Sequence, residues 1–305
     1  MGLETEVARR VLDSLVPERA EVRVVYARDR SAGLEATARL AGEAVRRYAS
    51  GLEEAARGHP LSALKLAIDK KLRTERPEHM DLDATPEPVR LQIIEGLALW
   101  NRLVRAYPTF VRAVAPLVEA AAAAGRRPAR VLELASGHGE LLAHVAEWAA
   151  GHGIEVELTG SDIVPAYVKL GEEKARARGA PVRYRVLDAL DLGDVEDGAF
   201  DVVLLTQTLH HFAPGQVARL FAEGSRVART GALFLDPARS VAVLAFVGAV
   251  TRAFFSRPMH EDAVTSMRKV RTDAEYELLA GVAPLAGRAR VRFVLPGYTA
   301  VEVRR

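Results

Sequence analysis

After Pro128 the sequence alternates between short runs of apolar, often β-branched residues and longer segments with apolar residues at helical spacing. The short runs, expected to be strands, are 130–134, 155–159, 182–187, 200–206 and 231–235. The longer segments, expected to be helices, are 140–150, 165–178 and 215–228. This alternation is typical of a parallel sheet with helices on both faces. We therefore predict an α/β, Rossmann-like, mostly parallel seven-stranded sheet, in which the last two strands, 288–295 and 298–303, form an antiparallel pair.

The segment before this alternation is expected to be mainly helical. Helical periodicity covers 4–15, 34–48, 91–104 and 115–124, and a β-branched run at 22–26 suggests one isolated strand. Thr85 and Pro86 are suited to begin the third of these helices. Residues 1–125 are thus predicted to form a helical cap or lid, and 126–305 the Rossmann-like domain. An apolar helical insertion is expected near 238–270, and Thr272 with Glu275 forms a capping box for the helix that follows it.

Composition excludes several classes of protein. The 305 residues carry a formal net charge of only +2 and no long basic run, which argues against a nucleic-acid partner. The absence of cysteine excludes disulfides and thiolate metal sites. The longest apolar run, 241–250, is too short to span a bilayer, and the N-terminus lacks an apolar signal core. We expect a cytoplasmic protein without a membrane span.

The segment 131–142 carries the strongest functional signal. An acid, Glu133, lies near the end of a predicted strand, and a turn of small residues leads into a helix: Ala135, Ser136, Gly137 and Gly139. Small residues let a ligand approach the backbone closely, and the helix that follows offers free N–H groups. The dinucleotide-binding fingerprint is the competing interpretation, but it requires a small residue where Leu142 stands. Because Ala135 occupies the first small position, we expect that position not to need a positive φ.

Three further strand ends carry polar or small residues. Asp162 and Ile163 follow the second strand, and a carboxylate there could accept hydrogen bonds from both ribose hydroxyls. Asp188 and Ala189 follow the third strand, where they could contact an adenine. Thr206 and Gln207 follow the fourth strand. Because ligands of open α/β sheets bind at the carboxyl ends of the strands, we expect a nucleoside site here.

The loop with Glu133, Gly137 and Gly139 resembles the first motif of class I S-adenosylmethionine-dependent methyltransferases, with Ala135 in place of the first glycine. The resemblance covers about 129–236. The sequence 209–212, Leu-His-His-Phe, resembles the ubiquinone/menaquinone-methyltransferase-like branch. The family implies a methyltransferase enzyme with S-adenosylmethionine as cofactor, bound by the residues named above. Segments 76–81, 94–104 with its sequence 100–103, 236–240 and 262–272 look like parts of small bacterial methyltransferases associated with polyketide or quinone-type products.

His210 and His211 are the candidate catalytic residues. An imidazole could accept the proton of a hydroxyl acceptor. The alternative is that both rings only shape the loop after the fourth strand. His138 is expected to contact cofactor or solvent. We expect no metal site, because the rings of adjacent histidines should diverge and no acidic ligand accompanies them at a suitable spacing.

Apolar residues outside the cofactor motifs suggest the type of acceptor. One set, Leu91, Ile93, Ile94, Leu97, Leu99 and Trp100, precedes the sheet, and another, Val241, Leu244, Phe246, Val247, Phe254 and Phe255, follows the fifth strand. Both could line a lid over a small apolar or aromatic metabolite. We therefore predict a small-molecule substrate, with O-methylation slightly favoured over C-methylation. A non-catalytic accessory binding protein and a nicotinamide-dependent reductase are the alternatives, and a homodimer is left open.

Overall fold

The computed structural model describes residues 2–305. Its centre is one sheet in the order β3-β2-β1-β4-β5-β7-β6. The strands are β1 (Ala129–Leu134), β2 (Val156–Asp162), β3 (Val182–Val186), β4 (Phe200–Thr206), β5 (Ala228–Pro237), β6 (Arg288–Val294) and β7 (Tyr298–Arg304). The first five strands run parallel, and β7 pairs antiparallel with both β5 and β6. The predicted fold class is confirmed.

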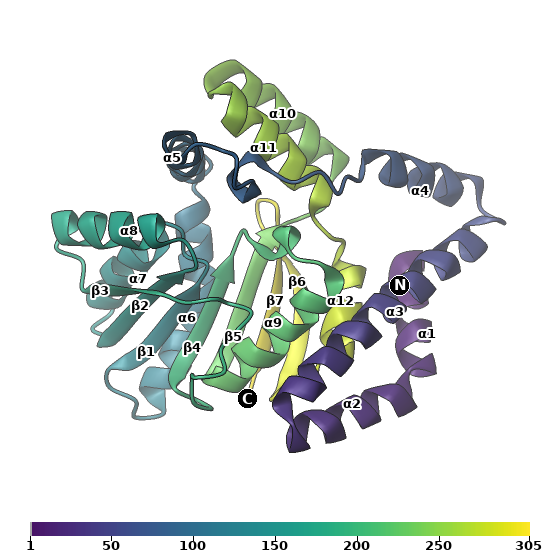
Figure 1. Cartoon of the computed structure of the whole chain (residues 1–305), viewed down its shortest axis with the longest axis horizontal. Helices are drawn as coiled ribbons and strands as arrows, with labels where there is room; N and C mark the ends of the chain where they lie inside the picture. Colours follow the sequence, from purple (N-terminus) through teal and green to yellow (C-terminus); the bar gives the residue numbers. More distant parts are fainter. Residues whose placement is uncertain (1) are drawn as a thin grey trace.

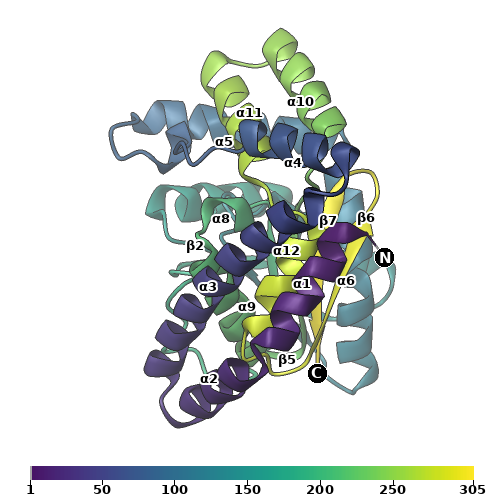
Figure 2. The same cartoon turned by 90° about the vertical axis from the view of Figure 1, so that its right-hand side faces the viewer.

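Both faces of the central strands β1, β4 and β5 are buried, which explains why these strands are mainly apolar. In β4, Val203 and Leu205 join the core under α9 (Pro214–Val227) and α12 (Asp273–Val282). Their neighbours Val202 and Leu204 join the opposite core, under α6 (Ala106–Ala123) and α7 (Glu140–Gly151). A third helix, α8 (Pro165–Arg178), packs on β2 and β3. Figure 2 shows the sheet nearly edge-on between α9 and α6.

The first three helices do not form a lid. They are α1 (Leu3–Ser14), α2 (Val16–Arg28) and α3 (Arg30–Ala56). α3 packs on α9 and α12, and α1 packs on α12, so both extend the core on that face of the sheet (Figures 1 and 2). The predicted strand at 22–26 is wrong, since these residues lie inside α2. There, packing against α3 outweighs the β-propensity of four β-branched or aromatic side chains.

A second group of helices lies beyond the carboxyl ends of the parallel strands (Figure 1). It contains α5 (Glu87–Leu103), α10 (Val241–Phe254) and α11 (Arg257–Lys269), with the short turn η1 (His79–Asp81) beside them. α4 (Pro60–Leu72) connects α3 to this group. α11 contacts α5, α10, η1 and the turn η2 (Leu209–His211) that follows β4. Part of the predicted cap and the helices near 238–270 therefore meet above the sheet.

Two prolines shift the predicted helix boundaries. α5 begins at Glu87, with Pro86 rather than Thr85 at the N-cap. The helix predicted at 115–124 begins earlier, at Ala106, and Pro108 lies in the first turn of α6, where a helix needs no N–H donor. The capping box at Thr272 and Glu275 is present at the start of α12. Among residues 2–305, no helix is both long and apolar enough to cross a membrane.

Candidate active site

The glycine loop connects β1 to α7 through three residues with positive φ. Ala135 has φ 49°, Gly137 55° and Gly139 66°. The expectation that Ala135 needs no positive φ is therefore wrong. A residue with a Cβ loses about 1–2 kcal/mol in this conformation, so the sharp reversal after β1 is imposed on Ala135 by the surrounding structure.

Each glycine of the loop meets a different neighbour. A Cβ added at Gly137 would lie 2.9 Å from Cδ1 of Ile94 on α5. A Cβ added at Gly139 would lie 2.1 Å from the hydroxyl oxygen of Tyr184, which donates a hydrogen bond to the Gly139 carbonyl at 3.1 Å. A side chain at position 139 would collide with Tyr184 of β3, so glycine is required there. Gly137 instead lies against Ile94 of α5, above the sheet.

Asp162 and the glycine loop are tied together. The backbone N–H of Gly137 donates to Oδ2 of Asp162 at 2.9 Å, and that of Val164 donates to Oδ1 at 2.9 Å. Burial raises the pKa of Asp162, whereas these backbone hydrogen bonds act to lower it. The carboxylate is therefore held in a fixed position, and each oxygen keeps a second lone pair for a ligand.

Glu133 is a buried acid with an unused oxygen. Its Oε1 accepts a hydrogen bond from the Thr206 hydroxyl at 3.2 Å. Its Oε2 is buried without a hydrogen-bond partner among residues 2–305, as is the hydroxyl of nearby Ser136. Burial raises the pKa of Glu133 to about 8. An unpaired buried carboxyl of this kind is expected to pair with a cationic ligand group.

A cavity of about 890 Å³ opens at the carboxyl ends of β1, β2 and β4, within the range of small-molecule and cofactor sites. Most of the predicted site residues line it: Glu133, Ala135, Ser136, Gly137, Asp162, Ile163, Thr206, Gln207, His210 and His211. His138 lines it too. Gly139, Asp188 and Ala189 do not. Asp188 accepts a hydrogen bond from the N–H of Leu190 at 2.8 Å, and Ala189 is buried in the core, so their contact with an adenine stays a prediction.

The far wall of the cavity is mostly apolar. From α5 it receives Ile93, Ile94, Leu97 and Trp100, and from α10 and α11 it receives Val247, Met259 and Met267. The predicted contribution of the segment 241–255 is largely wrong, because only Val247 of the six named residues lines the cavity. Phe246 and Phe255 instead pack against Trp100, and Phe254 is 79% exposed.

Asn101 is a cavity residue that the sequence analysis missed. Its Nδ2 donates to Oε1 of Gln207 at 2.7 Å, and its own Oδ1 is buried without a partner among the described residues. Gln207 has a positive φ of 56°. The contact joins α5 to the end of β4. Asn101 lies at helical spacing from Ile94 and Ala98 on the buried face of α5, and a polar residue at such a position was the signal that could have revealed it.

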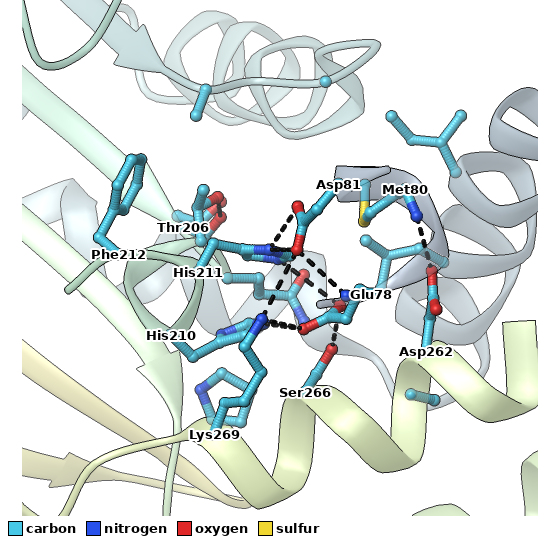
Figure 3. A pocket seen from close by; sticks show the side chains of 18 of the residues that line it. Glu78, Met80, Asp81, Thr206, His210, His211, Phe212, Asp262, Ser266 and Lys269 are labelled. Atoms are coloured by element: carbon cyan, nitrogen blue, oxygen red, sulfur yellow. Dashed lines mark hydrogen bonds and ion pairs between the residues drawn. The ribbon is translucent and has the colours of Figure 1, made fainter. Parts of the chain in front are cut away.

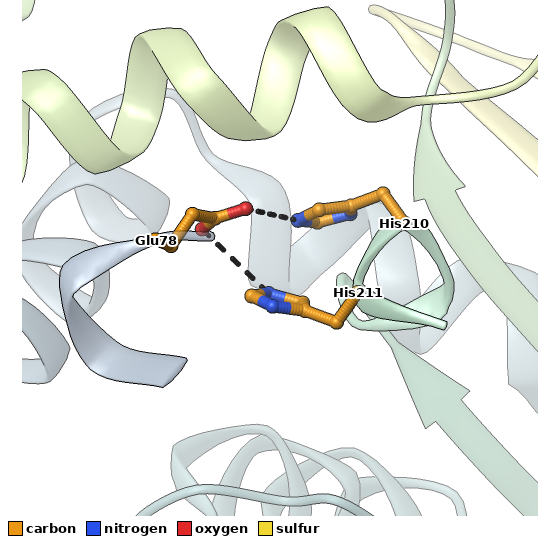
Figure 4. Close-up of side chains that lie close together, drawn as sticks. All are labelled: Glu78, His210 and His211. Carbon is orange, nitrogen blue, oxygen red and sulfur yellow. Dashed lines mark ion pairs between the residues drawn. The ribbon is translucent and has the colours of Figure 1, made fainter. Parts of the chain in front are cut away.

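The two histidines do not diverge, contrary to expectation. Their ring centroids lie 4.5 Å apart at an interplanar angle of 35°, and both rings face Glu78 (Figure 4). Nδ1 of His210 lies 2.9 Å from Oδ1 of Asp236, whose other oxygen accepts a hydrogen bond from the Tyr276 hydroxyl. The physical reason is the turn η2, which places consecutive side chains differently from a strand or an α-helix.

Carboxylates from η1 complete this cluster. Nδ1 of His211 lies 2.9 and 3.0 Å from the two oxygens of Asp81. Burial acts to lower the pKa of His211, but the hydrogen bond to Asp81 and the charge of Glu78 outweigh it, so the pKa is raised. Glu78 accepts hydrogen bonds from Ser266 and Lys269 of α11, at 2.6 and 3.2 Å (Figure 3). Glu78 and Asp81 are not among the site residues predicted from the sequence, although segment 76–81 carries part of the family resemblance.

Comparison with known proteins identifies the central domain. The family described as "Methyltransferase domain" matches residues 131–231, from β1 into β5. A demethylmenaquinone methyltransferase of Thermus thermophilus is 37% identical over 76 residues, which are 23% of this chain and 34% of the relative. The match thus spans about a third of that relative's length.

One of the solved structures compared below matches the fold with a TM-score above 0.5. The plantazolicin methyltransferase BpumL, in complex with a monoazolic desmethylPZN analog and SAH, matches with a TM-score of 0.55 and 12% identity, over 79% of this chain and 99% of that one. A SAM-dependent methyltransferase from Aquifex aeolicus matches with a TM-score of 0.42 and 17% identity, over 58% of this chain and 82% of that one. Residues 131–231, which contain the glycine loop, thus match a methyltransferase domain, and the fold of the chain agrees with that of the first of these structures.

Proposed function

We propose that this chain transfers the methyl group of S-adenosylmethionine to a small apolar or aromatic metabolite, with oxygen slightly favoured over carbon as the acceptor atom. The observation that carries the proposal is the continuous cavity. It runs from the glycine loop and Asp162 to the histidine pair and has an apolar wall from α5 and α11. The end with Glu133 and Asp162 offers carboxylates suited to a cationic nucleoside. The other end offers an apolar surface whose polar groups are those of the histidine pair.

The cofactor end fits S-adenosylmethionine by its chemistry. Glu133 has a buried carboxylate oxygen without a partner, which suits the ammonium group of the cofactor. Asp162 keeps free lone pairs for ribose hydroxyls, and Gly137 presents backbone without a side chain. When bound, the cofactor supplies an already activated methyl group on a sulfonium. The protein therefore has to align the acceptor and exclude water.

Exclusion of water is the proposed role of the helices above the sheet. Ile94 of α5 lies against the glycine loop, and Met259 and Met267 of α11 line the same cavity. These side chains would cover the reacting atoms, so α5 and α11 are the proposed lid, together with α10 behind them. A small apolar acceptor would bury its surface against them.

His210 and His211 are proposed to activate the acceptor hydroxyl. Each ring is oriented by a carboxylate at Nδ1, so in the neutral ring Nε2 carries the lone pair that could accept a proton. Proton acceptance at Nε2 contributes about 10²–10⁴-fold in rate where it operates. Loss of less than tenfold in both alanine variants would favour catalysis by positioning alone.

Calorimetric titration tests the cofactor first. S-adenosylmethionine and S-adenosylhomocysteine should bind in the micromolar range, about −8 kcal/mol, while NAD(P)H should not bind. The reverse preference would favour the nicotinamide-dependent reductase.

Radiolabelled methyl transfer tests the acceptor. Phenols and quinols should be labelled, and tRNA and bulk protein should not. Labelling of tRNA or protein alone would refute the small-molecule acceptor, and cofactor binding with no labelled acceptor would favour the accessory binding protein.

A further inference from the structure

Glu78, His210 and His211 surround a small gap at the acceptor end of the cavity. One nitrogen of each imidazole and one carboxylate oxygen all lie within 4.8 Å of one another. Nε2 of His210 is 3.8 Å from Oε1 of Glu78, and Nε2 of His211 is 3.7 Å from Oε2 (Figure 4). The Nε2 atoms of the two imidazoles thus face the two different oxygens of one carboxylate. This carboxylate comes from a segment about 130 residues earlier in the chain.

The hydrogen bonds of the histidines decide where their lone pairs point. Carboxylates accept hydrogen bonds only, so the Nδ1 atoms that face Asp236 and Asp81 must carry hydrogen. In the neutral rings, both Nε2 lone pairs are then directed at the oxygens of Glu78. Separations of 3.7 and 3.8 Å exceed the ~2.7–3.2 Å of a hydrogen bond. The gap is therefore lined by electron-rich atoms and calls for a positive charge between them.

We propose that Glu78, His210 and His211 bind a divalent transition-metal ion. Two imidazoles and one carboxylate are the ligand set of catalytic zinc sites that keep a further position open. A carboxylate on the other ring nitrogen, as Asp236 and Asp81 provide here, is typical of histidines that bind metals. Tetrahedral ligation at ~2.0 Å places neighbouring ligand atoms ~3.3 Å apart, so the ligand atoms, which lie within 4.8 Å of one another, would have to approach by up to about 1.5 Å. Mg²⁺ and Ca²⁺ are disfavoured because they prefer oxygen ligands.

The charges of the cluster are consistent with a divalent ion. Glu78, Asp81 and Asp236 contribute three negative charges, and Lys269, within 3.2 Å of Glu78 and 3.5 Å of Asp81, contributes one positive charge. A bound divalent ion brings the sum of these four side chains and the ion to zero. Lys269 and Ser266 satisfy Glu78 without the ion and compete with it for the same oxygens (Figure 3).

The consequence for catalysis rests on the proposed function, whereas binding of the ion does not. The site lies on the wall of the same cavity, so the open position is accessible to an acceptor hydroxyl. A divalent ion there favours loss of the hydroxyl proton, which passes to water. The oxygen then forms the bond to the methyl carbon, and the electrons of the broken carbon–sulfur bond return to sulfur. With the ion bound, the Nε2 lone pairs hold the metal and do not accept the proton.

Zinc calorimetry on the untagged, EDTA-treated full chain tests the site without cofactor. We expect one Zn²⁺ per chain with micromolar or tighter affinity. Glu78→Gln and His211→Ala should weaken binding at least about 100-fold, and Asp81→Asn about 10–100-fold. His144→Gln is the matched control, because it removes another histidine that faces a single glutamate, Glu147 at 3.4 Å. It should leave the affinity unchanged.

Two results would overturn the site. One is the absence of saturable Zn²⁺ binding to the native chain, and the other is equal affinity in the Glu78→Gln, His211→Ala and His144→Gln variants. Thermal unfolding and S-adenosylhomocysteine titration show whether each variant is folded. Zinc binding without any labelled small acceptor would refute the proposed function but support the ion site. Methyl transfer by a chain that binds no Zn²⁺ would support the proposed function but refute the ion site.

Discussion

Glu133 provides a quantitative test of the buried cofactor end. This side chain is 2% exposed in β1, and one of its carboxyl oxygens has no hydrogen-bond partner among the described residues. Burial raises its pKa from 4.5 to about 8 in the folded chain. The folded state therefore holds the proton more tightly than the unfolded state. The contribution of Glu133 to stability is complete at low pH and is lost as the pH rises from 4.5 through about 8.

The size of this effect follows from the two pKa values. Ionisation of Glu133 costs the fold about 1 kcal/mol at pH 5 and about 3 kcal/mol at pH 7. Glu133→Gln does not titrate and keeps an oxygen that can accept the hydrogen bond from Thr206. The stability of the variant relative to the native chain should therefore rise by about 2 kcal/mol between pH 5 and pH 7.

Urea unfolding of both proteins at pH 5, 6 and 7 measures this difference, because the titration of all other groups is common to the two chains. Glu196→Gln, which changes an exposed glutamate, is the control and should show no such trend. A constant difference between Glu133→Gln and the native chain across this range would refute the raised pKa.

Further substitutions test other parts of the site. Asp162→Ala should weaken S-adenosylhomocysteine binding by about 1–3 kcal/mol in calorimetry; unchanged affinity would remove Asp162 from the site. Gly139→Ala should destabilise the fold by about 1–3 kcal/mol in urea, because the added Cβ meets the Tyr184 hydroxyl; native stability would contradict the close contact. Ala135→Gly should relieve about 1–2 kcal/mol of strain against about 0.4–1 kcal/mol of added unfolded-state entropy, so its melting temperature should not fall. A clear fall would mean that the strain is absent.

The cofactor motifs were predictable because they are local. Strand and helix periods, the small residues after Glu133 and the acid after β2 all lie within short segments, and the order of elements then places strand ends at one edge of the sheet. The prediction of a strand at 22–26 failed because it, too, used only local residues. Three consecutive β-branched or aromatic residues do not indicate that the segment packs on another helix.

The sequence by itself determined the parallel sheet, the glycine loop and the presence of two adjacent histidines. The tertiary structure decided what those residues meet. Tyr184 reaches back to Gly139, and Ala135 accepts a positive φ because its neighbours on both sides are fixed. Glu78 and Asp81 reach the histidines only because α11 holds η1, with Asp262 accepting hydrogen bonds from the N–H groups of His79 and Met80. Contacts between segments so distant in the chain depend on how the helices pack, which no local pattern of residues encodes.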